Sequence, residues 1–308
     1  MKTAKLCLLA VLAILATSCG GTRETVVPEH LGAGAEQTAR GMPFYERGCY
    51  GRALEHFTRA NELFTAVGDS RGTAMSMNNI GVVYRAMGEA SAAIPFFEDA
   101  LRLYRGLGEP DRVRRTLSNL AAAQIDAGDT VSAGRNIDEA LKIENRGKPF
   151  APAMTVKGIL LARQGDVKGA ESMLKEALDD IDRRNPEGEA AANVAMGELL
   201  LGQARYKEAV PHFEKALESD RKAGFYRGIA DDFAALGRCS AGLRDDAGAV
   251  KFWEQSVRIY ALLGMEEKVR STLGLLEEAA KRSNLNIDLT RTLAERWLKG
   301  EMTDSLCE

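Results

Sequence analysis

The chain has 308 residues, of which 45% are hydrophobic and 28% charged, and its formal net charge is −3. This composition is typical of a folded globular protein with enough apolar material for a large core, and it excludes a largely disordered chain. The slight acidic excess argues against a nucleic-acid-binding protein, because such binding depends on lysine and arginine side chains that contact phosphates.

The first 18 residues have the pattern of a signal peptide. Lys2 and Lys5 precede an apolar run, Leu6 to Ala16, that is too short to span a membrane. The segment Leu-Ala-Thr-Ser-Cys that ends at Cys19 resembles a bacterial lipobox, in which the cysteine is lipidated and becomes the first mature residue. It departs from the usual pattern at Ala16, where leucine is common. Ordinary secretion and an uncleaved anchor remain the alternatives.

The lipobox resemblance implies where the mature protein resides. Lipoproteins of this kind are held by palmitate and related acyl chains, so we expect a membrane anchor at Cys19 and no spanning segment. Gly20 stands where aspartate signals inner-membrane retention in enterobacterial relatives, which implies the outer membrane, facing the periplasm. Loss of Lys2 and Lys5 leaves 39 basic and 44 acidic residues, a formal charge of −5. Residues 19–33 are expected to form a tether.

Three cysteines remain in the mature chain besides Cys19. Cys49, Cys239 and Cys307 are odd in number, far apart and without a CxxC pair. Their spacing predicts neither a disulfide framework nor a zinc site, and it favours small buried side chains or a free thiol in the tail.

The chain repeats itself with a period near 40 residues. One small residue recurs at spacings of 40, 40, 37, 39 and 40, at Gly41, Gly81, Ala121, Gly158, Gly197 and Gly237. We call these positions the anchors. Twelve residues after each anchor stands alanine: Ala53, Ala93, Ala133, Ala170, Ala209 and Ala249. Sixteen residues after it stands a bulky apolar residue: Phe57, Phe97, Ile137, Leu174, Phe213 and Trp253. Seven residues after it stand Gly48, Gly88, Gly128 and Gly165, then Ala204 and Arg244.

This pattern resembles the tetratricopeptide repeat (TPR). The resemblance implies an all-α, right-handed superhelical solenoid of about six helix-turn-helix units over residues 34–264. Each anchor would let the two helices of a unit approach closely, and the glycine seven residues later would end the first helix. Residues 265–300 are expected to form a C-terminal capping helix pair or a degenerate seventh repeat, and residues 301–308 a tail. An amphipathic membrane helix is the alternative for the segment near 286–299.

The repeats depart from the family at several positions. The bulky residue three after the anchor is replaced by Gln124 and Ser240, and the leucine before the anchor by Arg40 and Lys157. We expect these repeats to be looser or to carry a contact on that face. The period exceeds the usual 34 residues by about five, which predicts a longer second helix or loop.

The chain has few candidates for catalysis. His30, His56 and His212 belong to no known catalytic motif, and the two in the repeats are expected to be exposed. The acidic pairs at residues 231–232 and 245–246 are expected to be solvated or to lie at helix starts. We therefore predict no catalytic residues, no metal site, no small-molecule cofactor and no enzyme activity.

A binding groove is the better-supported prediction. In TPR proteins the first helices line the concave face, and asparagine two residues before the anchor commonly bonds the backbone of an extended peptide, because an amide both donates and accepts. Here that position holds Asn79 and Asn119, and Arg85 and Arg115 lie nearby in a stretch dense in arginine. The alternative is that the asparagines bond neighbouring helices and the arginines are solvated. We also expect the concave face to be basic toward the N-terminus and acidic toward the C-terminus.

Together these patterns predict a non-enzymatic adaptor of the bacterial envelope. Its partner would be an extended segment of a protein involved in outer-membrane, pilus or cell-wall assembly, bound without nucleic acid. The alternative is a structural subunit that packs by its convex face into a permanent complex.

Overall fold

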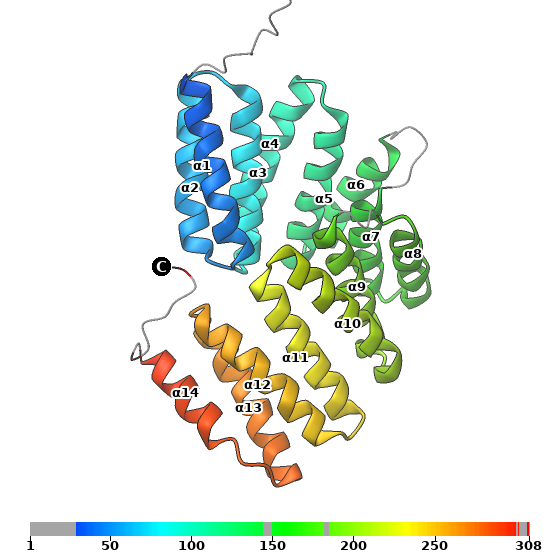
Figure 1. Cartoon of the computed structure of the whole chain (residues 1–308). Coiled ribbons are helices and arrows are strands. Elements are labelled where there is room, and N and C mark those ends of the chain that lie inside the picture. The colour runs from blue at the N-terminus through cyan, green and yellow to red at the C-terminus, as the bar shows by residue number, and fades with distance from the viewer. Residues whose placement is uncertain (1–28, 144–149, 182–184, 300, 302–306, 308) are drawn as a thin grey trace, which may run out of the picture.

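A computed structural model describes residues 29–143, 150–181, 185–299, 301 and 307. Within these residues the protein has fourteen α-helices and no strand, and the helices wind into a curved array (Figure 1). The helices are α1 (Glu29–Glu46), α2 (Tyr50–Ala66), α3 (Ser70–Ala86), α4 (Ala90–Gly106), α5 (Pro110–Asp126), α6 (Thr130–Lys142), α7 (Ala151–Arg163), α8 (Val167–Asp179), α9 (Pro186–Gly202), α10 (Tyr206–Ala223), α11 (Tyr226–Gly242), α12 (Asp246–Leu262), α13 (Glu266–Ser283) and α14 (Asp288–Leu298).

The helix lengths explain the period of 40 residues. Helices α2, α3, α4 and α5 each have 17 residues. Turns of three residues join them, as at 67–69, 87–89 and 107–109. The added length relative to the TPR family is therefore shared by both helices of a unit rather than confined to the second helix or the loop. The middle of the chain is shorter, since α6, α7 and α8 have 13 residues each.

The predicted packing of each hairpin is confirmed. All six alanines twelve residues after an anchor are 0% exposed, and the bulky residues sixteen after it are at most 3% exposed. A Cβ on Gly81 would lie 2.8 Å from Phe97 Cε1, and one on Gly197 would lie 2.8 Å from Phe213 Cε1. The anchor must therefore be small because a bulky side chain of the second helix, aromatic at Gly81 and Gly197, lies close to its Cα.

The turn inside each hairpin needs a left-handed residue. Gly48, Gly88, Gly128 and Gly165 have φ between 82° and 88°, as their place at the end of the first helix predicts. In the fifth and sixth hairpins the same conformation is held by Ala204, with φ of 57°, and Arg244, with φ of 63°. A side chain makes this conformation costly, so the surrounding hairpin must impose it.

The substituted repeats carry polar contacts rather than loose packing. Gln124 is 6% exposed. Its Oε1 accepts a hydrogen bond of 2.8 Å from Nδ2 of Asn136 on α6. Lys157, in place of leucine, forms an ion pair of 2.7 Å with Asp138. These side chains replace an apolar contact with a satisfied polar one.

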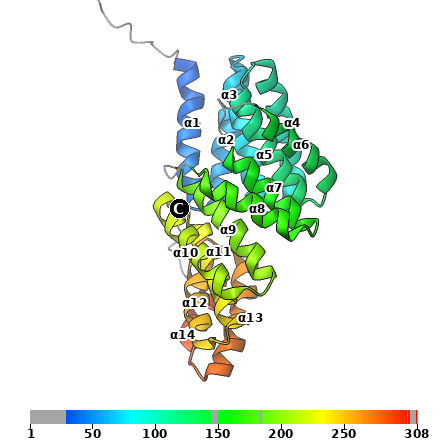
Figure 2. The same cartoon turned by 90° about the vertical axis from the view of Figure 1, so that its right-hand side faces the viewer.

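First and second helices occupy opposite sides of the array. The first helices of successive hairpins, from α1 through α3, α5, α7 and α9 to α11, contact one another and form the inner layer, while the second helices form the outer layer. The inner layer is the concave face of the array (Figures 1 and 2).

Both ends of the repeat array differ in detail from the sequence prediction. Helix α1 begins at Glu29, so residues 29–33 are helical rather than part of a tether. At the other end, Val269, Leu276 and Ala280 of α13 are buried and Leu273 is half-buried, whereas on α14 Leu289 is 67% exposed and Thr290 and Ala294 are the buried residues. Helix α14 packs mainly on α12.

The last hairpins return to the first one, which the sequence did not predict. The start of α11 lies beside the end of α1 and the start of α2 (Figures 1 and 2). The ring of Tyr45 stacks on that of Phe225 at a centroid distance of 5.9 Å. Leu263, which follows α12, would contact a Cβ placed on Gly48. We call this junction between the first and sixth hairpins the seam.

A disulfide links the first hairpin to the C-terminal tail. The prediction that the cysteines form no disulfide framework is therefore wrong. Cys49, in the first turn between helices, is bonded to Cys307, 258 residues further along the chain. Spacing alone gave no hint of it because the pairing depends on the chain returning to its start. Cys239 is free and buried, as expected.

No helix in the described ranges is both long enough and apolar enough to span a membrane. The signal peptide and Cys19 lie outside the described residues.

Candidate partner-binding face

Two of the four predicted groove residues keep their polar groups free of described partners. Asn79 on α3 is half-buried and Arg115 on α5 is exposed. Within residues 29–143, 150–181 and 185–299, neither makes a hydrogen bond or ion pair. A half-buried amide and an exposed guanidinium without partners are groups that can bind a ligand without first breaking an internal contact.

The other two predicted groove residues are engaged. Nδ2 of Asn119 donates a hydrogen bond of 3.1 Å to Oδ1 of Asn78, which ties α5 to α3. Arg85 forms an ion pair of 2.7 Å with Asp126 at the ends of the same two helices. Asn119 thus follows the alternative considered from sequence, in that it bonds a neighbouring helix.

Arg115 lies on a first helix, α5, and its charge acts on neighbours from two layers. Burial raises the pKa of Glu187 at the start of α9, Glu46 of α1 raises it further, and Arg115 opposes the rise. Arg115 also opposes the burial-raised pKa of Tyr104 on the outer helix α4.

The arginine-rich stretch divides between the two sides. Arg102 and Arg105 of α4 line an outer cleft of about 440 Å³ together with Leu120 and Asn136. Both also form ion pairs, Arg102 with Asp99 and Arg105 with Glu139. These arginines belong to the outer layer and cannot contribute to an inner groove.

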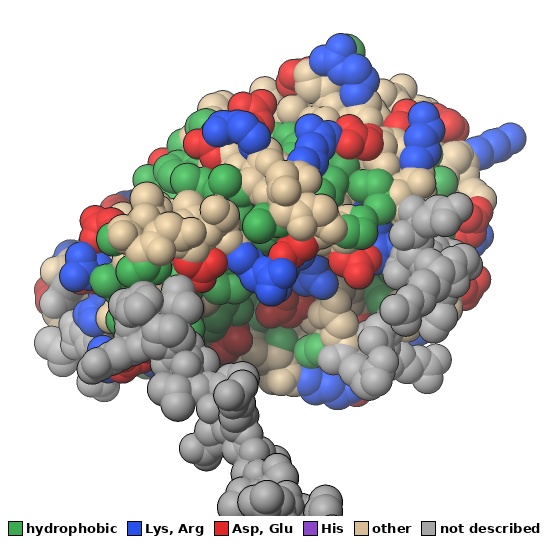
Figure 3. Space-filling view, turned by 90° about the horizontal axis from the view of Figure 1, so that it is seen from above, with side chains coloured by type: hydrophobic (Ala, Val, Ile, Leu, Met, Phe, Trp, Pro, Cys, Tyr) green, Lys and Arg blue, Asp and Glu red, His purple; other side chains and the backbone are tan. Residues whose placement is uncertain are grey.

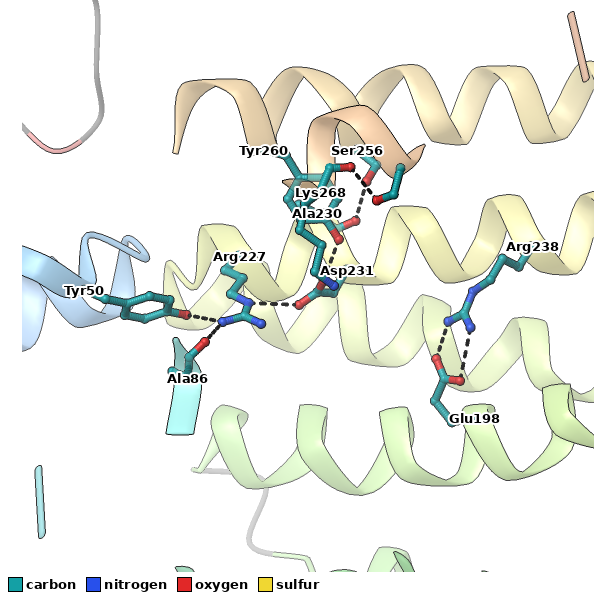
Figure 4. Close-up of polar contacts among 11 residues, drawn as sticks. Tyr50, Ala86, Glu198, Arg227, Ala230, Asp231, Arg238, Ser256, Tyr260 and Lys268 are labelled. Atoms are coloured by element: carbon teal, nitrogen blue, oxygen red, sulfur yellow. Dashed lines mark hydrogen bonds and ion pairs between the residues drawn. The ribbon is translucent and has the colours of Figure 1, made fainter. Parts of the chain in front are cut away.

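The expected change of charge sign along the concave face is reduced by ion pairing. Arg238 of α11 pairs with Glu198 of α9 by both terminal nitrogens (Figure 4). Arg85 is likewise neutralised by Asp126. Basic and acidic side chains are also interspersed on the surface seen from above in Figure 3.

A second, larger cleft is lined by residues of α8, α9 and α10. Its volume is about 890 Å³, and its lining includes Leu178, Met196, His212 and Lys215. His212 is half-buried, and its Nδ1 lies 3.1 Å from Oδ1 of Asn193 on α9. His56 holds the matching position in the first repeat, 2.8 Å from Gln37. The expectation that both histidines are exposed is therefore wrong, because each is held by an amide of the paired helix.

The two carboxyl groups at residues 231 and 232 are not both solvated, which differs from the sequence prediction. Oδ1 of Asp231 accepts a hydrogen bond of 2.5 Å from the Tyr260 hydroxyl, and Lys268 lies 3.4 Å from the same oxygen (Figure 4). Asp232 is 1% exposed, and its Oδ2 has no hydrogen-bond partner among the described residues.

The repeat register explains why Asp232 is buried. It lies five residues before its anchor, and the same position in the second to fifth repeats holds the buried residues Ser76, Thr116, Ala153 and Ala192. This signal was present in the sequence. By contrast, Asp245 is a helix-start residue as predicted, since its carboxylate accepts a bond of 2.9 Å from the backbone of Gly248.

Arg227 is the residue that sequence reasoning missed. From the first turn of α11, its guanidinium donates to the carbonyl oxygen of Ala86 at the end of α3, and it lies 3.5 Å from the Tyr50 hydroxyl (Figure 4). It also forms an ion pair of 3.3 Å with Asp231. Arg227 thus joins the sixth hairpin to the first two, and no local pattern marks it for this role.

No group of histidine, cysteine, aspartate or glutamate side chains in the described part of the chain has the arrangement of a metal site.

Comparison with known proteins agrees with the repeat pattern. Models of the tetratricopeptide repeat match residues 38–106 and 190–222. No curated protein is significantly similar to the chain. Among solved structures, a Rap protein complexed with Competence and Sporulation Factor matches with a TM-score of 0.58 and 17% identity, over 81% of this chain and 75% of the Rap chain.

Two further solved structures match less closely. BtubC from P. vanneervenii has a TM-score of 0.49 and 19% identity, over 71% of this chain and 91% of its own. YrrB, described as a TPR protein with an unusual peptide-binding site, has a TM-score of 0.36 and 18% identity, over 63% and 90%. The chain therefore contains tetratricopeptide repeats, and its fold is an all-helical TPR solenoid.

Proposed function

We propose that this protein is a non-enzymatic scaffold of the bacterial envelope, anchored by lipid at Cys19, that binds an extended segment of a partner protein on the concave face of its second and third repeats. The observation that supports the binding role concerns Asn79 and Arg115, which lie on α3 and α5, the first helices of the second and third hairpins. Both keep polar groups free of described partners on adjacent first helices. An amide can bond a peptide unit, and a guanidinium can bind a carboxylate by two parallel bonds.

Two further observations support the binding role and the location in the bacterial envelope. The Rap protein that shares the fold was solved in complex with a factor, which supports a binding role for this kind of array. The Cys49–Cys307 disulfide suits an oxidising compartment such as the periplasm, where disulfides persist. The choice of the outer membrane, facing the periplasm, rests on the lipobox resemblance and Gly20.

Site-specific photo-crosslinking in the native membrane tests the face that binds. A photoreactive residue at Asn79 should give a discrete crosslinked species, and the same residue at Val131, which is 70% exposed on the outer helix α6, should not. Alanine at Arg115 should remove the Asn79 crosslink. The matched control Arg105→Ala, on the outer side, should leave it intact. Crosslinking at Val131 but not at Asn79 would contradict the proposal.

The anchor is tested separately by labelling with a palmitate analogue. The wild type should incorporate the label and fractionate with outer membranes, whereas Cys19→Ser should not be labelled. An unlabelled wild type would contradict lipidation without affecting the binding proposal.

One observation favours the alternative of a structural subunit. The cleft between α8 and α10 is the larger of the two clefts described, at about 890 Å³, and its lining combines Leu178 and Met196 with many charged side chains. A photoreactive residue at Lys215, on the wall of this cleft, distinguishes the two functions. A crosslink at Lys215 that survives Arg115→Ala would support packing by the convex face.

A further inference from the structure

The seam depends on a short segment of the sixth hairpin. Phe225, in the turn between α10 and α11, stacks on Tyr45, and Arg227 two residues later bonds Ala86 and Tyr50. Most non-covalent seam contacts described above therefore come from one turn of the chain. Whatever moves this turn relative to α10 also moves the seam.

Two buried carboxyl groups lie directly beneath that turn. Asp220, in the last turn of α10, is 4% exposed and Asp232 is 1% exposed. The Asp220 carboxyl rests against Gly228 in the first turn of α11, where a Cβ would lie 1.8 Å from its Oδ2. The backbone oxygen of Asp220 accepts a hydrogen bond of 2.9 Å from the amide of Phe225. Asp220 thus contacts the turn between α10 and α11 both by its carboxyl group and by its backbone oxygen.

The charges facing these carboxyl groups are mainly negative. Asp220 faces Asp231 of α11 and Glu187 of α9. Asp232 faces Asp220, Asp231 and Glu198. Across the seam, Asp220 also raises the pKa of the Tyr50 hydroxyl on α2, where burial is the main cause and Arg227 opposes it. Four cations act on this group of acids. Arg227 and Lys268 both bind Asp231, and Arg238 binds Glu198. Arg115 makes no ion pair with a described residue but opposes the rise that burial causes in the pKa of Glu187.

We propose that the seam is a pH-sensitive closure, in which a protonated Asp220 lets the α10–α11 turn pack tightly and hold the first hairpin, and ionisation of Asp220 loosens the turn and releases the seam.

The direction follows from burial and from the neighbouring acids. An ionised carboxylate at the Asp220 site would lose hydration and be repelled by Asp231 and Glu187, so it is stable only if the turn opens to water. Burial raises the pKa of Asp220 to about 7, with Asp231 and Glu187 adding to the rise. Burial raises the pKa of Asp232 to about 9, with Asp220 the next cause.

The free energy of unfolding is expected to change with pH in the same direction as the closure of the seam. In an unfolded chain both groups titrate near pH 4, at about 3.9. The native state therefore holds protons that the unfolded state has lost, and stability falls as the pH rises from about 4 toward 7 for Asp220 and toward 9 for Asp232. The closed seam is the acidic form.

Hydrogen exchange of the full chain, corrected for the intrinsic pH dependence of exchange, tests the proposal. Peptides covering residues 43–52 and 220–230 should lose protection together by about tenfold between pH 6 and pH 8, since one pKa unit corresponds to a tenfold change. Asp220→Asn should keep both peptides protected at pH 8. The control Asp180→Asn, an exposed aspartate after α8, should behave like the wild type.

Two results would overturn the proposal. One is loss of protection at residues 220–230 with none at residues 43–52, which would mean that the turn loosens without releasing the seam. The other is Asp220→Asn titrating like the wild type. If Asp220→Asn does not fold, the wild-type titration decides, because a transition centred below pH 5 or no transition contradicts the assignment.

Any effect of the closure on partner access rests on the proposed function. The exchange measurement needs no partner and no lipid anchor. The pH dependence of exchange can therefore be absent while Asn79 crosslinks to a partner, and it can be present when Asn79 does not crosslink.

Discussion

The contact inside a hairpin and the contact at the seam hold the array together in different ways. In five of the six hairpins a glycine anchor meets a bulky side chain sixteen residues later, as Gly81 meets Phe97. At the seam, Arg227 and a stacked Tyr45–Phe225 pair join segments that are 141 and 180 residues apart, and this happens once. Local contacts build each unit, whereas the seam joins units that are far apart in the sequence.

The largest effect on stability is expected from removal of the disulfide. The Cys49–Cys307 bond closes a loop with a sequence separation of 258 residues, so it restricts the unfolded chain strongly. We expect Cys49→Ser/Cys307→Ser to lower the free energy of unfolding by about 4 kcal/mol, measured by urea denaturation without reductant. Dithiothreitol should have the same effect on the wild type and none on the double variant.

A thiol assay in urea gives an independent check of this bond. The lipid-free mature chain with Cys19→Ser, purified from the periplasm, should show one free thiol, at Cys239. Three free thiols would mean that the two ends are not linked.

The next largest effect is expected inside a hairpin. Gly81→Val would place new atoms within 2.8 Å of the Phe97 ring, and we expect it to destabilise the protein by about 3 kcal/mol through overpacking. Adding Phe97→Leu should recover part of the loss. Gly274→Ala, in α13 with no atom within 4 Å of its new Cβ, is the control and should be neutral or slightly stabilising. Equal losses for the two glycines would contradict the close-approach explanation.

Removal of the seam arginine should have a smaller effect. Arg227→Met keeps the aliphatic stem but removes the bonds to Ala86 and Asp231, and we expect a loss of about 2 kcal/mol. Arg238→Met removes a more exposed pair with Glu198 and should cost less than about 1 kcal/mol. Hydrogen exchange should locate the Arg227→Met effect at residues 43–52 as well as on α11. A change confined to α11 would show that the seam does not hold the first hairpin.

The smallest effect is a stabilisation within the repeats. Arg244 has φ of 63° where four other hairpins have glycine, so Arg244→Gly should relieve backbone strain and stabilise the protein by about 1 kcal/mol. The reverse change at the matching turn, Gly128→Arg, should destabilise by a similar amount. Thermal denaturation of both variants measures the difference, and a destabilising Arg244→Gly would show that its side chain makes a contact that outweighs the strain.

The candidate site illustrates how far repeat register extends the sequence prediction. The repeat register places Asn79 and Arg115 on the first helices of neighbouring hairpins. It also predicts that Asp232 is buried, which the acidic pair considered by itself does not. It could not show that Asn119 bonds Asn78, because that pairing depends on the separation of α3 and α5 in space.

The sequence by itself determined the hairpin unit, its period and its buried positions, because each depends on residues fewer than about 40 apart whose spacing matches helix geometry. Only the tertiary structure decided the seam, the Cys49–Cys307 bond and the burial of Asp220 beneath the seam. These depend on small rotations between successive hairpins that accumulate over six units, and no local pattern records their sum.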